Sequence, residues 1–373
     1  MVPAASLPPA AAHRFSLTDV LPGALAALRG ERGRLALPPV RHAVVVLVDG
    51  LGAAQLRERA GHARRLLGAA SSTSSISSGF PTTTVAAITS LTTGESPGRH
   101  GMVGYRALDP ERGGVVEHLS GWPRDLDPAT WQRRSTLFEL SPDVRSVAVG
   151  PAPYARSEFS AAVLRGAEYL GADGLEARAA LVREVVHGGD RSLTYLYVAE
   201  LDVAGHRHGW QSDPWIAALE ELDGVLGPLA AALPRDAGML LTADHGMVDV
   251  AADDHVIPSP ELLEGVLHVA GEPRGLQLHL APGVAADDVA GRWRAVEGTR
   301  AWVATRDEAI AAGWFGEVDP EVRPRIGDVL VVARRPVAYY VDPDDRGRRM
   351  VGQHGALTPA EASVPLLRFG AFG

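Results

Sequence analysis

Three strongly apolar segments of this chain each lead to an aspartate, and this pattern constrains the possible folds more than any other. The first is His42-Ala-Val-Val-Val-Leu-Val before Asp49, the second starts at Leu193 and reaches Asp202, and the third ends in Asp244. A continuous apolar run rich in β-branched residues is typical of a strand buried on both faces of a parallel sheet. Helical patterns separate the three segments, so their order predicts an α/β fold, a doubly wound, mostly parallel sheet with helices on both faces.

Histidines accompany these aspartates at the expected strand ends, where ligands bind in open α/β sheets. Three carboxylates at one rim repel each other and need a counter-charge, and histidine nitrogen with carboxylate oxygen is a zinc-type ligand set. Each residue alone has an ordinary explanation, as a turn former or a solvated histidine, but the combination favours metal binding. Six residues are therefore predicted to form two near-tetrahedral sites: Asp49, Asp202, His206, Asp244, His245 and His354.

The segment from Ser78 to Gly101, SGFPTTTVAAITSLTTGESPGRHG, predicts a helix with Pro81 in its first turn and an end set by Gly94. Any of the three threonines after the proline can cap the helix. A hydroxyl at a helix start faces free amides and the positive end of the helix dipole, which favours an alkoxide or a phosphate. Two metals beside such a hydroxyl are a recurring arrangement for phosphoryl transfer.

Composition excludes several classes of protein. With 373 residues the chain can form a large domain with a smaller inserted one, and its formal charge of −9 lacks the basic footprint that binding to nucleic-acid polymers requires. It contains no cysteine, lysine or asparagine, which removes these residues from the catalytic candidates. No signal-peptide pattern or run of roughly 20 apolar residues is present, so a soluble, cytoplasmic protein without a membrane partner is expected. The oligomeric state stays open.

The lengths and spacing of the expected helices and strands predict that the chain has three parts. Residues 1–39 form an N-terminal leader with a helix over residues 17–29, and residues 40–250 with 344–373 form the core. Shorter alternating units between residues 251 and 343 predict an inserted α+β cap.

Five separated motifs, LVDGLG, FPTTT with TGESPGRHG, ELDVAGHRHG, TADHGM and QHG, resemble the alkaline phosphatase superfamily. Within it the chain is most similar to the type I phosphodiesterase/nucleotide pyrophosphatase family. The resemblance implies that Thr84 is the nucleophile and a metal ligand, passing through a phosphothreonine. It also implies two divalent ions, zinc being the expected metal. Asp49, Asp244 and His245 would bind the ion that activates Thr84, and Asp202, His206 and His354 would bind the other.

The chain also departs from this family. Phosphodiesterase members usually have an asparagine after the His-Gly step to bind a phosphoryl oxygen, whereas this chain has Tyr105 as the nearest substitute, a neutral donor. Together with Phe80 and Trp210 this tyrosine is predicted to contact the organic part of the substrate.

Several functions stay open. The favoured one is hydrolysis of phosphodiester or nucleotide pyrophosphate bonds in a small phosphate ester or nucleotide. A phosphomonoesterase or phosphonate hydrolase is the alternative in the same fold. A phosphoglycerate-mutase-like isomerase and a non-catalytic metal-binding protein rank lower, the latter because Thr84 and all six predicted ligands are present.

Overall fold

The computed structural model describes residues 7–9 and 13–373, and its largest unit is a seven-stranded sheet. The strands are β1 (His42–Val48), β2 (Ser72–Ser77), β5 (Arg145–Gly150), β6 (Glu168–Gly171), β7 (Ser192–Val198), β8 (Ala237–Thr242) and β17 (Ser363–Gly370). Their order in the sheet is β2-β17-β8-β1-β7-β5-β6. The five strands from β8 to β6 are parallel, and β17 pairs antiparallel with both β8 and β2. The predicted α/β fold with a mostly parallel sheet is confirmed.

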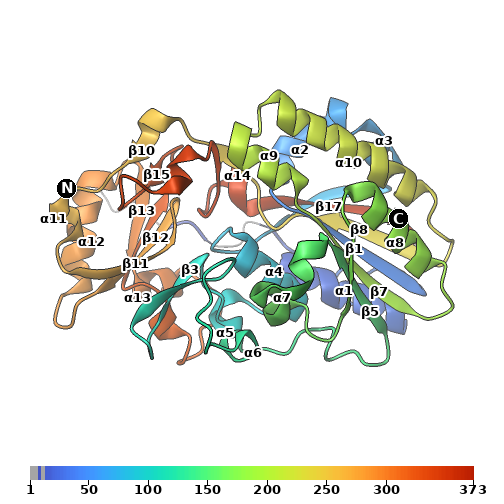
Figure 1. Cartoon of the computed structure of the whole chain (residues 1–373), viewed down its shortest axis with the longest axis horizontal. Helices are drawn as coiled ribbons and strands as arrows, with labels where there is room; N and C mark the ends of the chain where they lie inside the picture. Colours follow the sequence, from blue (N-terminus) through green and yellow to red (C-terminus); the bar gives the residue numbers. More distant parts are fainter. Residues whose placement is uncertain (1–6, 10–12) are drawn as a thin grey trace.

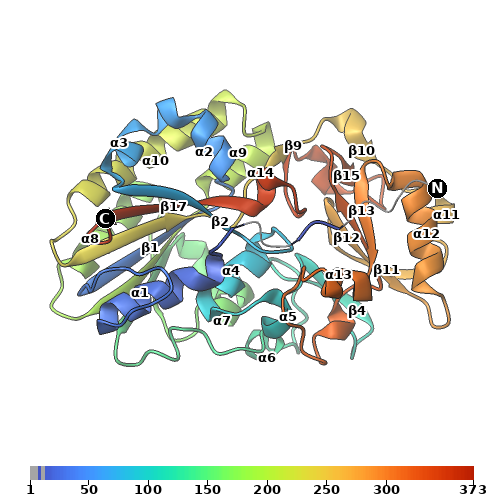
Figure 2. The ribbon, with the colours of Figure 1, turned by 180° about the vertical axis from the view of Figure 1, so that it is seen from behind.

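Helices cover both faces of this sheet (Figures 1 and 2). On one side lie α2 (Ala53–Glu58), α3 (Arg64–Ala69), α9 (Glu200–His208) and α10 (Asp213–Ala231), and on the other lie α1 (Val20–Arg29), α4 (Thr84–Thr93) and α7 (Glu158–Val163). The remaining helices are α5 (Pro97–His100), α6 (Pro128–Trp131), α8 (Leu175–Val186), α11 (Pro260–Leu263), α12 (Ala286–Glu297), α13 (Arg306–Ala311) and α14 (Pro359–Ala362). No helix in the described part of the chain is long and apolar enough to cross a membrane.

A second, smaller sheet lies beside the first and has its own hydrophobic core (Figure 1). Its strands are β11 (Val266–Glu272), β12 (Gly275–Leu280), β14 (Val329–Ala333) and β13 (Ala301–Thr305), antiparallel in this order. Three two-stranded pairs complete the fold: β3 (Arg106–Asp109) with β4 (Gly114–Glu117), β9 (Val248–Asp249) with β16 (Gly352–Gln353), and β10 (His255–Val256) with β15 (Ala338–Tyr339). The proposed limits of the cap, residues 251–343, stay a prediction.

Helix α4 connects the two cores. Val85 packs in the core of the smaller sheet, whereas Ile88 and Leu91 pack in the core of the larger one. The first residue of α4, Thr84, is thereby placed at the junction of the two sheets.

Three local predictions need correction. Asp202 does not end a strand: β7 stops at Val198, and Asp202 lies in the first turn of α9. Pro81 precedes the first turn of α4, since the N-cap is Thr83, whose side chain makes no capping hydrogen bond. The continuous helix expected over residues 53–67 is divided into α2, a short 3₁₀ turn and α3. The sequence makes no prediction for the serine-rich residues 71–78, which contain the strand β2 because their backbone pairs with β17.

Candidate metal centre

The inner half of the site consists of Asp49, Asp244 and His245, all buried at the ends of adjacent strands. Asp49 follows β1 and Asp244 lies two residues beyond β8, and these strands are neighbours in the sheet. His245 Nε2 lies 3.4 Å from Asp49 Oδ1 and 3.4 Å from Asp244 Oδ2. The backbone N–H groups of Gly50 and His245 donate to Asp244 Oδ1, at 3.1 and 2.9 Å, and fix this carboxylate.

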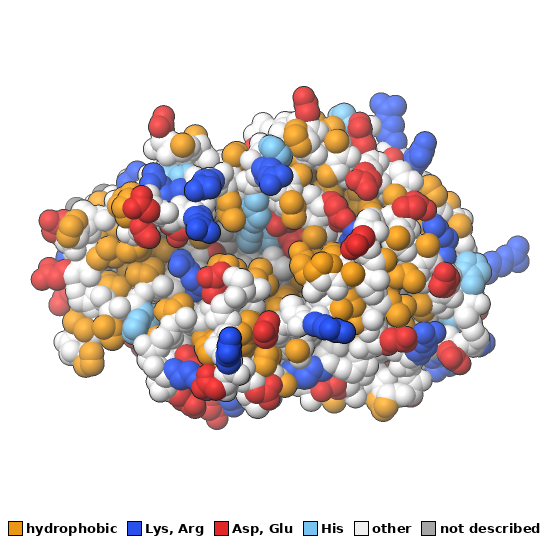
Figure 3. Space-filling view, viewed as in Figure 1, with side chains coloured by type: hydrophobic (Ala, Val, Ile, Leu, Met, Phe, Trp, Pro, Cys, Tyr) orange, Lys and Arg blue, Asp and Glu red, His pale blue; other side chains and the backbone are white. Residues whose placement is uncertain are grey.

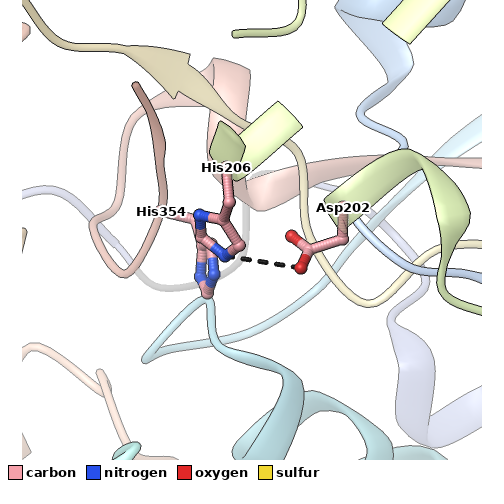
Figure 4. Close-up of side chains that lie close together, drawn as sticks. All are labelled: Asp202, His206 and His354. Atoms are coloured by element: carbon pink, nitrogen blue, oxygen red, sulfur yellow. Dashed lines mark ion pairs between the residues drawn. The ribbon is translucent and has the colours of Figure 1, made fainter. Parts of the chain in front are cut away.

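The outer half consists of Asp202, His206 and His354 (Figure 4). Asp202 and His206 are one turn apart on α9, and their side chains point toward each other with Asp202 Oδ2 3.3 Å from His206 Nε2. His354 arrives from the C-terminal segment, and its ring lies 5.1 Å from that of His206. The ring of His354 also stacks on His245 with centroids 3.6 Å apart, which joins the two halves.

All three histidines are held in the same way. Each Nδ1 lies within hydrogen-bond distance of a backbone carbonyl: His206 with Gly352 (2.8 Å), His245 with Gly246 (3.1 Å) and His354 with Thr82 (2.8 Å). A carbonyl only accepts, so Nδ1 carries the proton and the lone pair is on Nε2. This arrangement is the usual one for metal-binding histidines.

The carboxylates of the site have the unpaired oxygens that a cation would satisfy. Asp49 Oδ1, Asp202 Oδ1 and Asp244 Oδ2 are buried and have no hydrogen-bond partner in the described part of the chain. Single ligand atoms from Asp202, His206 and His354 lie within 4.8 Å of one another, as do those from Asp49, Asp202 and His245. Asp202 therefore borders both halves. The residues present fit bound divalent metal, because an unpaired buried carboxylate is costly without a counter-charge.

Burial and mutual repulsion also shift the ionisation of these groups. Burial, followed by the charge of Asp244, holds the pKa of Asp49 well above its ordinary value. Burial raises the pKa of Asp244 to about 7, and burial with the charge of Asp49 raises the pKa of Asp202 to about 6. Burial, with the neighbouring His245 and His206, lowers the pKa of His354 well below its ordinary value. Such shifts concentrate at functional sites.

Thr84 lies beside the inner half. Its Oγ1 is 3.3 Å from His245 Nε2, and it is the first residue of α4, where the helix amides are free. The His-Gly step that follows the threonine helix has a structural role in this arrangement. His100 is fully buried, its Nε2 is 3.0 Å from the Ser90 hydroxyl, and its Nδ1 accepts from the Met102 N–H.

Thr84 and four of the six candidate metal ligands, Asp49, Asp202, His206 and His354, line one cavity of about 900 Å³. Figure 3 shows histidine side chains inside a hollow near the middle of the molecule. Of the three residues predicted to contact substrate, Tyr105 lines this cavity, with its hydroxyl donating to Glu117. Phe80 and Trp210 do not line it. Phe80 is buried against Trp314 and Phe315, and Trp210 packs on Trp215, so the structure gives no support to their predicted role.

Several cavity residues were not found from the sequence. Tyr197 donates its hydroxyl to Asp49 Oδ2, and Glu272 is buried with its Oε2 accepting from the Tyr105 N–H at 3.0 Å. Burial raises the pKa of Glu272 to about 8. For Glu272 the sequence does contain a signal, namely a charged Glu272-Pro-Arg274 turn inside an apolar hairpin. Tyr154 and Arg106 also line the cavity.

The fold and the site together define a metal-dependent hydrolase of the alkaline phosphatase superfamily. The family model of type I phosphodiesterase / nucleotide pyrophosphatase matches residues 43–357, so the chain belongs to this family of phosphoric ester hydrolases. No curated protein matches the chain by sequence.

Solved structures share the fold at low sequence identity. Phosphonoacetate hydrolase from Sinorhizobium meliloti 1021, in complex with phosphonoacetate, has a TM-score of 0.71 and 19% identity, covering 90% of this chain and 91% of that one. Murine ectonucleotide pyrophosphatase / phosphodiesterase 5, an inactive threonine-to-alanine variant in complex with AMP, has a TM-score of 0.67 and 18% identity, covering 87% of both chains. The human form of that protein has a TM-score of 0.67 and 17% identity, covering 88% of this chain and 87% of that one.

Proposed function

We propose that this chain hydrolyses phosphodiester or nucleotide pyrophosphate bonds of small molecules, with Thr84 as the nucleophile and two zinc ions bound by the inner and outer halves. The observation that supports this most directly is the position of Thr84 Oγ1. It lies 3.3 Å from His245 Nε2 at the start of α4, and Thr84 lines the same cavity as Asp49, Asp202, His206 and His354. Membership of the family supports the reaction class.

In this proposal the six candidate ligands divide into two sets of three, one for each ion. Asp49, Asp244 and His245 would hold one ion, and Asp202, His206 and His354 the other. Two bound divalent ions would lower the pKa of the attacking hydroxyl and neutralise charge on the phosphoryl and leaving oxygens. The free amides at the start of α4 would stabilise the equatorial phosphoryl oxygens.

The reaction we propose has two steps, both centred on Thr84. Thr84 Oγ1 gives its proton to solvent and forms a bond to phosphorus while the bond from phosphorus to the leaving oxygen breaks; an alcohol leaving group takes up a proton from solvent, and Thr84 is left as a phosphothreonine ester. A water molecule then attacks phosphorus, the bond to Thr84 Oγ1 breaks, and the hydroxyl regains a proton. From a diester the products are an alcohol and a phosphate monoester, and from a nucleotide pyrophosphate they are a nucleoside monophosphate and the remaining phosphate group. The inactive threonine-to-alanine variant of the murine structural neighbour supports a threonine nucleophile.

The walls of the cavity favour a diester over a monoester. Leu119, Tyr154, Phe159 and Leu164 line it on one side, and they offer apolar surface to a second ester group. A phosphate monoester would leave this surface in contact with water.

Phosphonate hydrolysis is the second candidate, because the fold of phosphonoacetate hydrolase covers 90% of this chain. A phosphonoacetate carboxylate requires a cation, and Arg106 and Arg346 line the cavity. Release of inorganic phosphate from phosphonoacetate at a rate above that of diester hydrolysis would favour this alternative.

The test is a substrate panel with zinc-loaded enzyme and the Thr84→Ala variant. We expect bis-p-nitrophenyl phosphate to be cleaved faster than p-nitrophenyl phosphate. Thr84→Ala should abolish turnover while elemental analysis still finds two zinc ions. Thr93→Ala is the matched control at the other end of the same helix, because the Thr93 hydroxyl does not line the cavity and bonds only to backbone, donating to Thr89 O at 2.7 Å and accepting from the Glu95 N–H at 3.2 Å. Diester hydrolysis retained by Thr84→Ala would contradict the proposed nucleophile.

A further inference from the structure

Tyr197 contacts the inner half of the metal centre from a neighbouring strand. In the parallel pairing of β1 and β7, Tyr197 lies opposite Leu47, two residues before Asp49. Side chains two residues apart on a strand lie on the same face, so this register directs Tyr197 toward Asp49. The Tyr197 hydroxyl donates to Asp49 Oδ2.

The two carboxylate oxygens of Asp49 therefore differ in their hydrogen bonding. Oδ2 accepts the tyrosine hydroxyl, whereas Oδ1 is buried, has no hydrogen-bond partner in the described chain, and lies 3.4 Å from His245 Nε2. The hydrogen bond fixes the orientation of the carboxylate and leaves Oδ1 facing the neighbouring ligand.

The orientation of the Asp49 carboxylate depends on the Tyr197 side chain, whereas the backbone fixes the orientation of the Asp244 carboxylate. Asp244 Oδ1 accepts two backbone N–H groups, from Gly50 and His245. Among the hydrogen bonds of the described residues, no backbone N–H donates to the carboxylate of Asp49. The tyrosine hydroxyl supplies for Asp49 what the backbone supplies for Asp244.

We infer that Tyr197 is a positioning residue of the inner metal site, which selects Asp49 Oδ1 as the metal ligand by occupying Oδ2. This inference rests on the proposed metal centre and adds a residue that acts on the ion through Asp49. Hydrogen-bond partners of metal ligands orient them, and loss of such a partner costs about 10- to 100-fold in metal affinity.

The chain provides a matched control two residues earlier on the same strand. Tyr195 lies on the same face of β7, is 2% exposed, and its hydroxyl has no hydrogen-bond partner in the described part of the molecule. Tyr195→Phe and Tyr197→Phe remove the same atom from neighbouring buried positions, but only Tyr197→Phe removes a hydrogen bond to Asp49.

The experiment titrates zinc into metal-free wild type, Tyr197→Phe and Tyr195→Phe in competition with a chromophoric chelator. We expect Tyr197→Phe to weaken one of the two ions about 10- to 100-fold and Tyr195→Phe to change neither by more than about twofold. Thermal unfolding of each metal-free protein shows that the variants are folded. Zinc affinities equal to wild type in Tyr197→Phe would overturn the inference, whereas a wild type that binds no zinc would contradict the proposed metal centre instead.

A second set of variants tests whether Tyr197 affects zinc binding through Asp49. In an Asp49→Ala background, Tyr197→Phe should cost no further zinc affinity, since the carboxylate that it positions is gone. A further loss as large as that in wild type would show that the tyrosine acts on the site by another route and would overturn the inference. This cycle stays informative if Tyr197→Phe alone is less stable than wild type.

Discussion

The two halves of the metal centre differ in burial and in the elements that form them. The inner half has side chains that are 0–3% exposed, and it follows two adjacent strands of the large sheet. In the outer half, Asp202 and His206 are 15% and 23% exposed and lie on α9, while His354 comes from the C-terminal segment. One half is therefore part of the sheet, and the other is assembled from a helix and a returning loop.

This difference indicates a difference in preorganisation. The inner carboxylates are fixed before any ion binds, because backbone N–H groups hold Asp244 and the Tyr197 hydroxyl holds Asp49. The outer histidines are held through carbonyls of Gly352 and Thr82, which depend on how the C-terminal segment docks. We expect the inner ion to bind tightly and the outer ion to exchange.

The largest expected effect comes from removing an inner charge. Asp244→Asn keeps the shape of the side chain but removes a carboxylate from a fully buried site. If the ion supplies several kcal/mol of charge stabilisation in the transition state, kcat/KM should fall by about 10³-fold or more. Diester hydrolysis by the zinc-saturated variant measures this, and excess zinc should not restore activity. Recovery of activity at high zinc would remove the distinction between the halves.

The next largest effect concerns the ion pair of Arg274 and Glu361, which supports the segment that carries His354. Both side chains are fully buried, and Glu361 Oε1 also accepts from the Ala356 N–H, two residues after His354. Removing one partner of a buried pair costs about 3–5 kcal/mol. Arg274→Met should lower the free energy of unfolding by this amount and weaken only the outer ion.

Denaturant unfolding and zinc titration measure these two effects separately. Arg183→Met is the matched control, since the pair of Arg183 with Glu176 is exposed and should contribute about 0–1 kcal/mol. Loss of both ions in Arg274→Met would show that the halves are not independent.

The inner half could be predicted almost completely from the sequence. Asp49 and the Asp244-His245 pair directly follow apolar segments, and the carboxyl ends of adjacent parallel strands meet at one edge of the sheet. The spacing of Asp202 and His206 fits one turn of a helix, which α9 confirms. His354 is predicted as a ligand with the other five residues, but its place beside them depends on the path of the C-terminal segment, which no local pattern encodes.

The residues that the sequence did not reveal depend on long-range packing. The contact of Tyr197 with Asp49 requires the register of β1 and β7, which no local pattern encodes. Phe80 lies in a turn before α4, and only the smaller sheet's core decides that it is buried rather than open to the cavity. Likewise, β2 forms from a serine-rich segment because β17 is available as a partner.

Asp244 of the inner half and His354 of the outer half should also contribute to stability with opposite dependences on pH in metal-free protein. Burial raises the pKa of Asp244 to about 7 from an ordinary value of 3.8, so the folded state binds more protons than the unfolded state between these limits. Stability from this group therefore falls as pH rises from about 4 to 7. Each pKa unit corresponds to about 1.4 kcal/mol, so the change is a few kcal/mol.

His354 has the opposite sign because its folded pKa lies well below the ordinary value of 6.5. The folded state then binds fewer protons, and stability from this group rises with pH up to about 6.5. Melting temperatures of chelator-treated Asp244→Asn and His354→Gln between pH 4.5 and 7.5 test these two opposite pH dependences of stability. Asp244→Asn should flatten the decline with pH and His354→Gln should steepen it. Identical profiles for both variants would show that neither group determines the pH dependence.

The smallest expected effect on activity is that of His206→Ala, when zinc is saturating. The side chain is 23% exposed and is one of three outer ligands, so water can replace it at the ion. Loss of a hydrogen-bond partner of a metal ligand costs roughly 10- to 100-fold in metal affinity. Loss of the ligand His206 itself should lower zinc affinity at the outer half by at least as much. At high zinc, however, kcat should recover to within about tenfold of wild type, because Asp202 and His354 still hold the ion beside the cavity. Diester hydrolysis at increasing free zinc measures this recovery, with Asp244→Asn as the control that should not recover. If His206→Ala stayed inactive at every zinc concentration, the outer ligands would be as indispensable as the buried inner ones, and exposure would not separate the two halves.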